Sequence, residues 1–286
     1  MHTGGWRFGA VLALAWTLLA FLVAPLLVVA PVSVTDQRYL SMPQSGLSLQ
    51  HYWNIVGDSF WLSSILQSVL VAGVSTLCAV GLGTLCAIGC WRLASRASGM
   101  VRSVMLLPLI VPGIVHALGF FRMWIDLDLL DSFAGVILAH TITSLPYVVI
   151  TVSASLANFD VRLEQAARNL GASLGQTIRT VIVPCVLPGV LSGGIFAFVH
   201  AWDELIVLLF ITSRNVYLLP RAIWNGINEN VDPTIAAIAT LLIVLTLAGL
   251  VAERMLRRRA ERPRAPARAR PSAAATGAAP ALATGD

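Results

Sequence analysis

The stretch LEQAARNLGASLGQTIRTVIVP, from Leu163 to Pro184, is the one long polar insert near the middle of a very apolar chain. Its first apolar residues recur at the i, i+3, i+4, i+7 spacing of one helix face, namely Leu163, Ala166, Ala167 and Leu170. Gly171 follows, and a glycine in this place commonly ends a helix. We therefore expect a short amphipathic helix with a glycine stop, held between two membrane spans and suited to docking against another protein.

These residues resemble the EAA loop of ABC importer permeases, which reads Glu-Ala-Ala, three residues, Gly, nine residues and Ile-x-Leu-Pro. Aligned on Gly171, this chain reads Gln165-Ala166-Ala167 before the glycine and Val181-Ile182-Val183-Pro184 after it. Gln165 stands where the family usually has Glu, with Glu164 directly before it, and two valines replace Ile and Leu. The alternative reading of the segment is an ordinary interfacial helix.

The resemblance implies that residues 159–184 form a coupling loop, which sits in a groove of a cytoplasmic ATPase. The residues expected to carry closure of the ATPase to the membrane spans are Glu164, Gln165, Ala166, Ala167, Gly171 and Pro184. The substitution of Gln165 for Glu would change any contact in the family that depends on the carboxylate.

The composition indicates a membrane protein that does not hydrolyse ATP itself. Hydrophobic residues make up 57% of the 286 residues and charged residues 12%, with a mean hydropathy of +0.80. Repeated apolar runs of about 18 or more residues indicate membrane spans. All 19 basic residues are Arg. Because a Walker A loop needs a Lys that reaches the phosphates, ATP hydrolysis by that route is excluded, as is a Schiff-base lysine.

The four cysteines predict neither a disulfide framework nor a metal site. Cys78, Cys86 and Cys90 lie in one apolar run and Cys185 at the start of another, so none falls in an expected outside loop. Cys86 and Cys90 share a helix face at i, i+4, but no His or carboxylate lies near them. We therefore expect them to act as small hydrophobic residues.

Six apolar segments are long enough to cross a bilayer as helices. They are residues 8–30, 63–90, 103–124, 134–156, 188–211 and 234–252. Pro108 and Pro112 predict a kink in the third. With this arrangement fifteen Arg residues fall on the side of the two termini and four on the other. The positive-inside rule therefore places both termini in the cytoplasm.

The segments group into three regions of the chain. Residues 1–62 would hold the first transmembrane helix and a periplasmic loop, residues 63–256 the permease core, and residues 257–286 a cytoplasmic tail. The tail is rich in Arg, Pro and Ala with almost no large apolar residue, so we expect it to be disordered. The Arg run at its start, Arg254 and Arg257 to Arg259, is expected to lie against anionic lipid headgroups rather than to bind nucleic acid.

The candidate transport path centres on Asp203 and Glu204, in HAWDELIVLLF of the fifth segment. Carboxylates within a span are costly and usually face a polar path or a partner. His200 lies one turn earlier and Trp202 directly precedes the pair. Carboxylates supply charge and an indole face supplies cation–π contact, which together suit a cationic amine. The alternative is that the pair marks the outer membrane boundary or bridges to a neighbouring subunit.

Two other histidines, His116 and His140, fall in the third and fourth segments. Each is a candidate proton relay. The favoured expectation for both is a buried histidine that is hydrogen-bonded to backbone. No catalytic or metal-ligating residue is expected elsewhere in the chain.

The resemblance extends beyond the coupling loop. Residues 63–259 look like a type I ABC importer permease, and residues 159–173, 196–212 and 219–243 are similar to the permeases of spermidine/putrescine importers. It implies an all-α polytopic fold with six transmembrane helices in the bacterial inner membrane. The implied partners are the lipid bilayer, a second permease subunit, a cytoplasmic ABC ATPase dimer and a periplasmic solute-binding protein. No catalytic activity and no cofactor are implied.

The solute implied is a small organic cation such as spermidine or putrescine, with 2-aminoethylphosphonate or another small solute as the alternative. A rival from a different class is an ion-coupled secondary transporter with Asp203 and His200 as proton carriers. A third is an intramembrane enzyme. The coupling loop favours the importer, since a secondary transporter has no reason to hold an ATPase-facing helix there.

Overall fold

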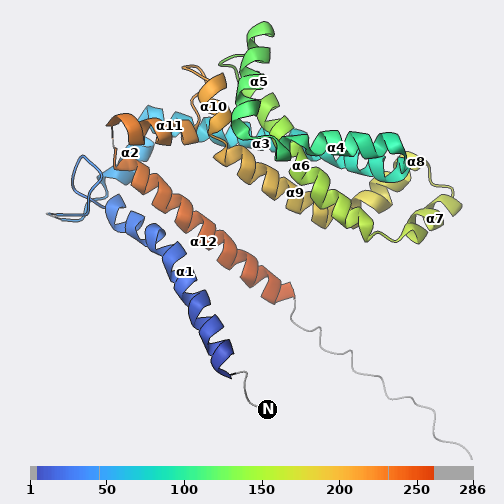
Figure 1. Ribbon diagram of the computed structural model, residues 1–286, viewed down its shortest axis with the longest axis horizontal. Helices are drawn as coiled ribbons and strands as arrows, with labels where there is room; N and C mark the ends of the chain where they lie inside the picture. Colours follow the sequence, from blue (N-terminus) through green and yellow to red (C-terminus); the bar gives the residue numbers. More distant parts are fainter. Residues whose placement is uncertain (1–4, 45, 231, 261–286) are drawn as a thin grey trace, which may run out of the picture. The chain divides into compact units, whose positions relative to one another are not determined.

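The computed structural model describes residues 5–44, 46–230 and 232–260, and all secondary structure found there is helical (Figure 1). The helices are α1 (Gly5–Ser33), α2 (Gln50–Gly57), α3 (Ser59–Leu93), α4 (Arg96–Ile110), α5 (Gly113–Asp126), α6 (Phe133–Ala157), α7 (Val161–Asn169), α8 (Leu174–Thr177), α9 (Val183–Asp203), α10 (Ile206–Ile211), α11 (Leu219–Asn225) and α12 (Thr234–Ala260), with the π-helical segments η1 (Ile178–Ile182) and η2 (Gly226–Asn230). The expectation of an all-α fold is confirmed. The expected disordered tail lies almost wholly outside the described residues.

Four helical stretches are long and apolar enough to cross a membrane, namely Phe8–Ser33, Ser59–Leu93, Phe133–Ala157 and Leu174–Asp203. A fifth is obtained if the bent pair α4 and α5 counts as one span. The apolar part of α12, Thr234–Gly249, is shorter. The described residues therefore support four or five spans by length and composition, and the count of six stays a prediction.

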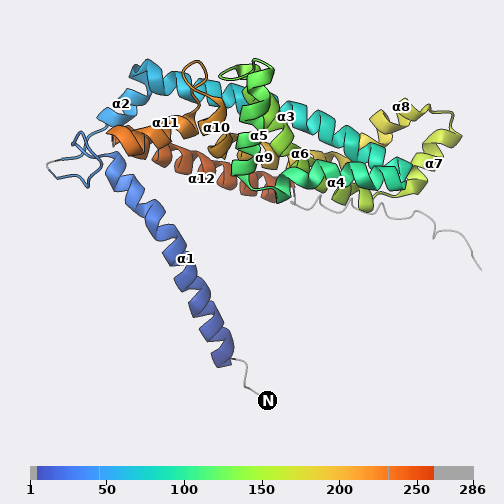
Figure 2. The same cartoon turned by 45° about the horizontal axis from the view of Figure 1, so that its top comes forward.

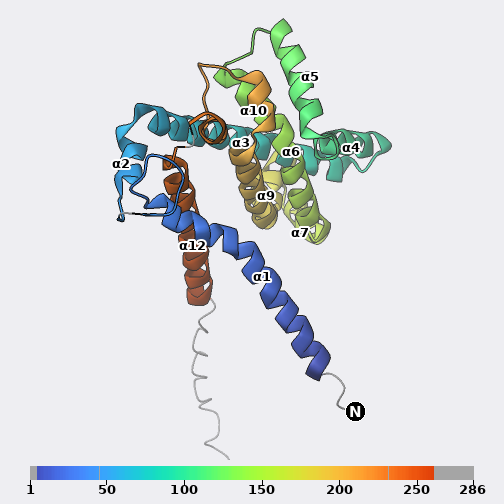
Figure 3. The ribbon, with the colours of Figure 1, turned by 60° about the vertical axis from the view of Figure 1, so that its left-hand side comes forward.

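The third expected span is broken rather than merely kinked. The axes of α4 and α5 differ by 106°, and Figure 3 shows the two helices meeting at a sharp corner. Pro112 lies at the break, where its missing N–H and the restriction it places on Val111 both oppose a continuous helix. Pro112 therefore marks the correct place with an effect larger than expected, whereas Pro108 lies inside α4.

The fifth expected span, residues 188–211, is also wrong as one continuous helix. It begins earlier, because α8, η1 and α9 join into one stretch from Leu174, and it ends at Asp203. Glu204 adopts an extended backbone, and its Oε1 accepts the N–H of Val207 at 3.1 Å at the start of α10. A side chain that satisfies a free N–H at a helix start stabilises such a break.

Helices α3, α6 and α9 pack together through small residues. A Cβ at Gly83 of α3 would lie 2.9 Å from Val148 of α6, and one at Gly193 of α9 would lie 2.9 Å from the same residue's backbone. Val148 is fully buried between them. Glycine on both neighbours therefore lets the three helices approach closely, as packing of helices in lipid requires.

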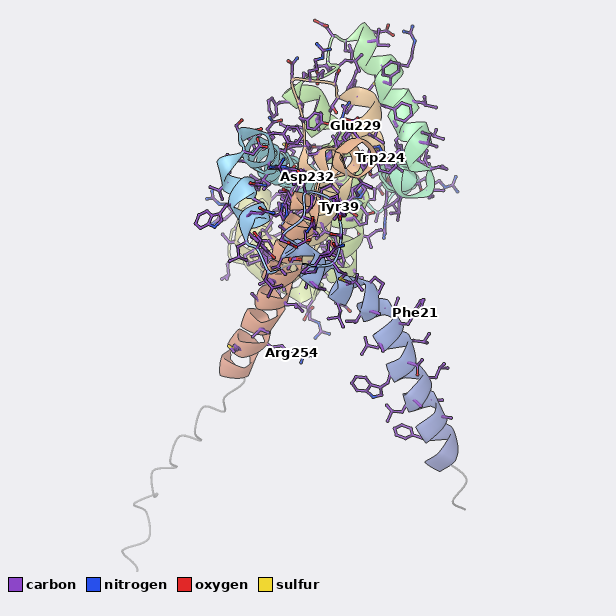
Figure 4. The ribbon with its side chains drawn as sticks, turned by 90° about the vertical axis from the view of Figure 1, so that its left-hand side faces the viewer. Phe21, Tyr39, Trp224, Glu229, Asp232 and Arg254 are labelled. Carbon is purple, nitrogen blue, oxygen red and sulfur yellow. The ribbon has the colours of Figure 1, made fainter. Side chains whose placement is uncertain are left out.

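A separate apolar cluster joins α5, α6 and α10. Phe120 and Trp124 of α5 pack with Val136 of α6 and Leu208 of α10, and Trp124 Nε1 donates to the carbonyl of Gly135 at 3.1 Å. The described residues up to Ile238 form one compact unit and those from Ala239 a second. In contrast to the core, the most apolar 18-residue window of α1 buries none of its residues, and Phe21 is exposed (Figure 4), whereas Ser33 at the end of the helix is buried.

Helix α3 is the longest helix of the first unit. Its 35 residues correspond to about 50 Å at 1.5 Å per residue. Figures 1 and 2 show α2 and α11 near its N-terminal end and α7 and α8 near its C-terminal end.

Candidate functional site

Helix α7 forms where the sequence predicts it and stops at the predicted glycine. Gly171 has a φ of +88°, a left-handed conformation that costs glycine little. Its N–H donates to the carbonyl of Arg168 at 3.0 Å, and the N–H of Ala172 donates to that of Ala167 at 3.1 Å. This bond pair is the Schellman motif, so the helix stop is confirmed. At the other end Asp160 accepts the N–H of Arg162 at 2.9 Å.

The predicted apolar face of α7 is not packed against the rest of the described chain. Leu163 is 48% exposed and Leu170 is 89% exposed. Gln165 and Ala166 are exposed as well, and Ala167 is partly buried. The side chain of α7 that is buried is Glu164, at 8% exposure. The apolar face is therefore available to a partner, while the helix is held to its own chain by a carboxylate.

Glu164 is buried because it meets Arg92 of the last turn of α3, with Arg92 Nη1 donating to Glu164 Oε1 at 2.6 Å. Beside this ion pair the rings of Trp91 and Phe159 meet edge to face at 5.7 Å. A shallow groove of about 350 Å³ lies here, lined by Trp91, Arg92, Val161, Glu164, Gln165 and Arg168. Sequence reasoning counted Arg92 only as an orienting charge and missed this partner.

The chain continues from the glycine stop into a long helical stretch. Ser173 Oγ caps α8 by accepting the N–H of Gln176 at 3.3 Å. The helix then passes through η1 and enters α9, where Pro184 occupies the first turn. The stretch Leu174–Asp203 is 30 residues long, about 45 Å at 1.5 Å per residue. It links the end of α7 directly to Asp203.

Three of the four predicted path residues line one cavity at the far end of this stretch. This α9 cavity has a volume of about 250 Å³ and is lined by Tyr147, Phe196, Val199, His200, Asp203 and Glu204. His200 Nε2 lies 3.9 Å from Glu204 Oε2, and the rings of Tyr147 and His200 are 5.0 Å apart. Trp202 does not line it and stacks on Phe198 instead, at 5.9 Å. The aromatic walls come from Tyr147 and Phe196.

The two other histidines have different surroundings. His140 is fully buried, and its Nδ1 lies 3.0 Å from the carbonyl oxygen of Ala201, which confirms the expected backbone hydrogen bond. His116 is only partly buried and its side chain makes no hydrogen bond with the described residues, so the same expectation is wrong for it; its ring lies 6.4 Å from that of Phe120. The contact of His140 ties α6 to the last turn of α9, directly beside the α9 cavity.

Asp131, in the α5–α6 connection, is a structural residue that sequence reasoning missed. Its carboxylate accepts the N–H groups of four consecutive residues at 2.7 to 3.2 Å, namely Ser213, Arg214, Asn215 and Val216. Burial by itself would raise the pKa of Asp131, but these four donors outweigh it and lower the pKa below the usual range. The residue therefore fixes the α10–α11 connection from more than eighty positions away.

Cys86 and Cys90 do not form a metal site with other described residues. Cys86 Sγ and Cys90 Sγ are 3.9 Å apart on α3. Within the part of the chain that the structure describes, no group of three or more His, Cys, Asp or Glu residues is placed to hold a metal ion.

Comparisons with known proteins match most of this chain. The family described as "Binding-protein-dependent transport system inner membrane component" matches residues 79–262. The spermidine/putrescine transport system permease protein PotC of Haemophilus influenzae is 29% identical over 247 residues, covering 86% of this chain and 96% of that protein. The putrescine transport system permease protein PotI of Escherichia coli K12 is 26% identical over 255 residues, 86% of this chain and 89% of that protein.

A relative with a different named solute matches as well. The trehalose transport system permease protein SugB of Mycobacterium tuberculosis is 29% identical over 218 residues, covering 75% of this chain and 79% of that protein. Among solved structures, a bacterial ABC transporter involved in alginate import has a TM-score of 0.66 at 13% identity, covering 90% of this chain and 98% of that one. The MetNI methionine ABC transporter has a TM-score of 0.58 at 15% identity, covering 74% and 99%.

Proposed function

The chain belongs to the family of binding-protein-dependent transport system inner membrane components, and we propose that it passes a small organic cation, specifically a polyamine, inward across the bacterial inner membrane. It is a permease subunit of an ABC importer, and permeases of this kind do not catalyse a reaction themselves. The solute and the roles of individual residues are the proposed part.

The observation that carries the solute assignment is the composition of the α9 cavity. Asp203 and Glu204 supply negative charge there, and the rings of Tyr147 and Phe196 supply π faces. This combination binds ammonium groups through charge and cation–π attraction. Percent identity alone does not select the solute, because the trehalose permease is 29% identical over 218 residues and the polyamine permease 29% identical over 247 residues. The carboxylates could accept hydrogen bonds from a neutral sugar, but only a cation adds ion-pair and cation–π attraction, so the cavity favours the amine.

We propose six spans with both termini in the cytoplasm. The broken pair α4 and α5 would count as one span, the stretch from α8 to α10 as one, and α12 as the sixth. The excess of Arg on the side of α7 supports this orientation. The N-terminal end of α3 and the α10–α11 connection would then face the outside.

In this arrangement α7 is the contact with a cytoplasmic ATPase. The exposed Leu163 and Leu170 would enter an apolar groove of that partner, while the Arg92–Glu164 ion pair keeps α7 attached to α3. A displacement of α7 would pass through the Gly171 turn into the continuous stretch Leu174–Asp203. Because this stretch ends at the α9 cavity, movement of α7 would change the shape of the cavity.

The further partners we propose are a second permease subunit and a solute-binding protein outside. The apolar surface of α1, unburied within the described chain, is available to lipid or to the second permease. No cofactor of its own is required for the passage of a solute. ATP would be bound and hydrolysed by the ATPase dimer.

The test is ATP-driven uptake of labelled spermidine by proteoliposomes that hold the complete importer. Unlabelled putrescine, trehalose and 2-aminoethylphosphonate serve as competitors. The proposal predicts strong competition by putrescine and none by trehalose. ATP-driven uptake of labelled 2-aminoethylphosphonate in the absence of spermidine uptake would move the solute to that class, and uptake that proceeds without ATP would contradict the importer mechanism.

A further inference from the structure

A second cavity lies at the N-terminal end of α3, at the end opposite the Arg92–Glu164 contact. This α11 cavity has a volume of about 310 Å³. Its walls include three carboxylates and three aromatic rings, from Asp58, Glu229, Asp232, Phe60, Trp61 and Tyr217. They come from the start of α3, the α10–α11 connection, η2 and the residues before α12, and Figure 4 labels Glu229 and Asp232.

The carboxylates of this cavity have no counter-ion within the described residues. Asp58 Oδ1 accepts the N–H of Phe60 at 2.9 Å and Asp232 Oδ1 accepts that of Thr234 at 2.8 Å. Each therefore keeps its second oxygen available. Glu229 makes neither a hydrogen bond nor an ion pair with any described residue, and no Arg or His lines the cavity. Three unpaired negative charges around one cavity repel one another, and a bound cation would relieve that repulsion.

The aromatic wall supplies a second and independent preference for a cation. Phe60 has its ring 5.3 Å from that of Trp61 and 5.3 Å from that of Tyr217. Tyr217 already makes a cation–π contact with Arg221, whose Cζ lies 5.3 Å from the centroid of the tyrosine ring. The ring is held in place by Asn225, which donates a hydrogen bond to its hydroxyl. Because Arg221 already contacts Tyr217, the rings of Phe60 and Trp61 are the ones left to offer cation–π contact to a ligand.

The arrangement suits an organic ammonium ion better than a metal ion. Calcium and magnesium require several oxygens at about 2.0–2.6 Å from one centre. No such group of His, Cys, Asp or Glu residues is present in the described part of the chain. Carboxylates spread around a cavity and interleaved with rings instead match amino groups separated by methylene chains.

We propose that the α11 cavity is a second binding site for a diamine or polyamine, distinct from the α9 cavity. The inference rests on the proposed orientation and solute of the importer. In that orientation the cavity opens at the outer end of α3, where a binding protein would release its solute. It would receive the amine before the solute reaches Asp203 and Glu204.

The experiment is equilibrium binding of labelled spermidine, without ATP, to the membrane complex of both permeases and the ATPase dimer in nanodiscs. The complex carries Asp203→Asn/Glu204→Gln and lacks the solute-binding protein, so that neither the α9 cavity nor that protein contributes to the binding. The variant Glu229→Gln/Asp232→Asn removes two charges, and Asn keeps the oxygen that caps Thr234. The matched control Asp126→Asn/Asp128→Asn removes two charges from the same side without touching the cavity. A third variant, Phe60→Leu, removes one ring and keeps an apolar wall. Each is measured in nanodiscs with and without phosphatidylethanolamine.

The proposal predicts that the cavity variant weakens spermidine binding at least tenfold, that Phe60→Leu weakens it severalfold, and that the control leaves it unchanged. Equal weakening of spermidine binding in the cavity variant and the control would mean that surface charge alone causes the effect, and it would contradict a binding site in the α11 cavity. Displacement of spermidine by Mg²⁺ at equal concentration would contradict the claim that the cavity prefers an organic ammonium ion to a metal ion. Loss of spermidine binding only in the presence of phosphatidylethanolamine would assign the cavity to the lipid headgroup.

The same measurement separates this inference from the proposed function. Spermidine uptake by a wild-type importer that binds no spermidine at the α11 cavity would overturn the second site alone. Absence of both uptake and binding would remove the polyamine as the solute as well. If Asp203→Asn/Glu204→Gln leaves uptake unchanged while the α11 variant still weakens binding, the α9 path is wrong and the second site stands.

Discussion

The guanidinium of Arg92 and the carboxylate of Glu164 meet at 2.6 Å although they are 72 positions apart in the chain. One ends the long helix α3 and the other is the buried side chain of α7. In the proposed arrangement this contact would hold α7 to α3 while the exposed apolar residues of α7 remain available to the ATPase.

Exchange of Arg92 for Gln is expected to lower the uptake obtained per ATP hydrolysed, since α7 would no longer follow α3. A charge-assisted hydrogen bond contributes about 1.5–3 kcal/mol, and the partial exposure of both side chains reduces that figure. Glu164→Gln should give the same defect. The reversed pair Arg92→Glu/Glu164→Arg should recover much of the coupling. If each single variant couples normally, the ion pair has no role in transmission.

Gly171→Ala is expected to destabilise the turn after α7 by about 1–2 kcal/mol, because φ of +88° is unfavourable for a residue with a Cβ. Gly175 is the matched control, since it lies in α8 with open space around its Cα. Thermal unfolding of the purified complex checks the difference. An equal change in Tm for Gly171→Ala and Gly175→Ala would contradict the role assigned to the turn.

Leu170→Asp is expected to abolish association with the ATPase without lowering the Tm of the permease, because 89% of the leucine side chain is exposed. Asn169→Asp adds the same charge at the neighbouring, also exposed position outside the predicted apolar face and serves as the control. Co-purification of the ATPase with each variant is the measurement. Retention of the ATPase by Leu170→Asp would show that α7 docks through other residues.

Asp131→Asn is expected to weaken the anchoring of the α10–α11 connection and to reduce the acid sensitivity of the protein. The pKa of Asp131 is lowered in the folded state, so its contribution to stability is present above about pH 4, the ordinary value for Asp. It is lost as the pH falls through the lower folded value. The drop in Tm between neutral and acidic pH should therefore be smaller in the variant. An identical drop in both proteins would contradict this assignment.

Features that depend on neighbouring residues were predictable from the sequence. The spacing of Leu163, Ala166 and Leu170 predicts α7, Gly171 predicts its end, and Pro112 predicts the break between α4 and α5. Each follows from backbone geometry within one or two turns. The position of the carboxylates beside His200 was also predictable, because i, i+4 spacing places them on one helix face.

Features that depend on distant partners were not predictable. Burial of Glu164 requires Arg92, and the four donors to Asp131 lie more than eighty positions away. The break at Glu204 depends on its side chain accepting the N–H of Val207 while it also lines the α9 cavity, and residue type does not settle that. Trp202 faces Phe198 rather than the α9 cavity because the helix rotation is set by packing on α6.

ATP-driven uptake of labelled spermidine by the complete importer, compared between wild type and Asp203→Asn/Glu204→Gln, tests the central claim most directly. Both substitutions keep the side-chain shape and remove the charge, and Gln at 204 keeps the oxygen that accepts from Val207. The account predicts ATPase activity near that of wild type and at least a tenfold loss of spermidine uptake. Undiminished uptake in the variant would contradict the assignment of the α9 cavity as the path for a cationic solute.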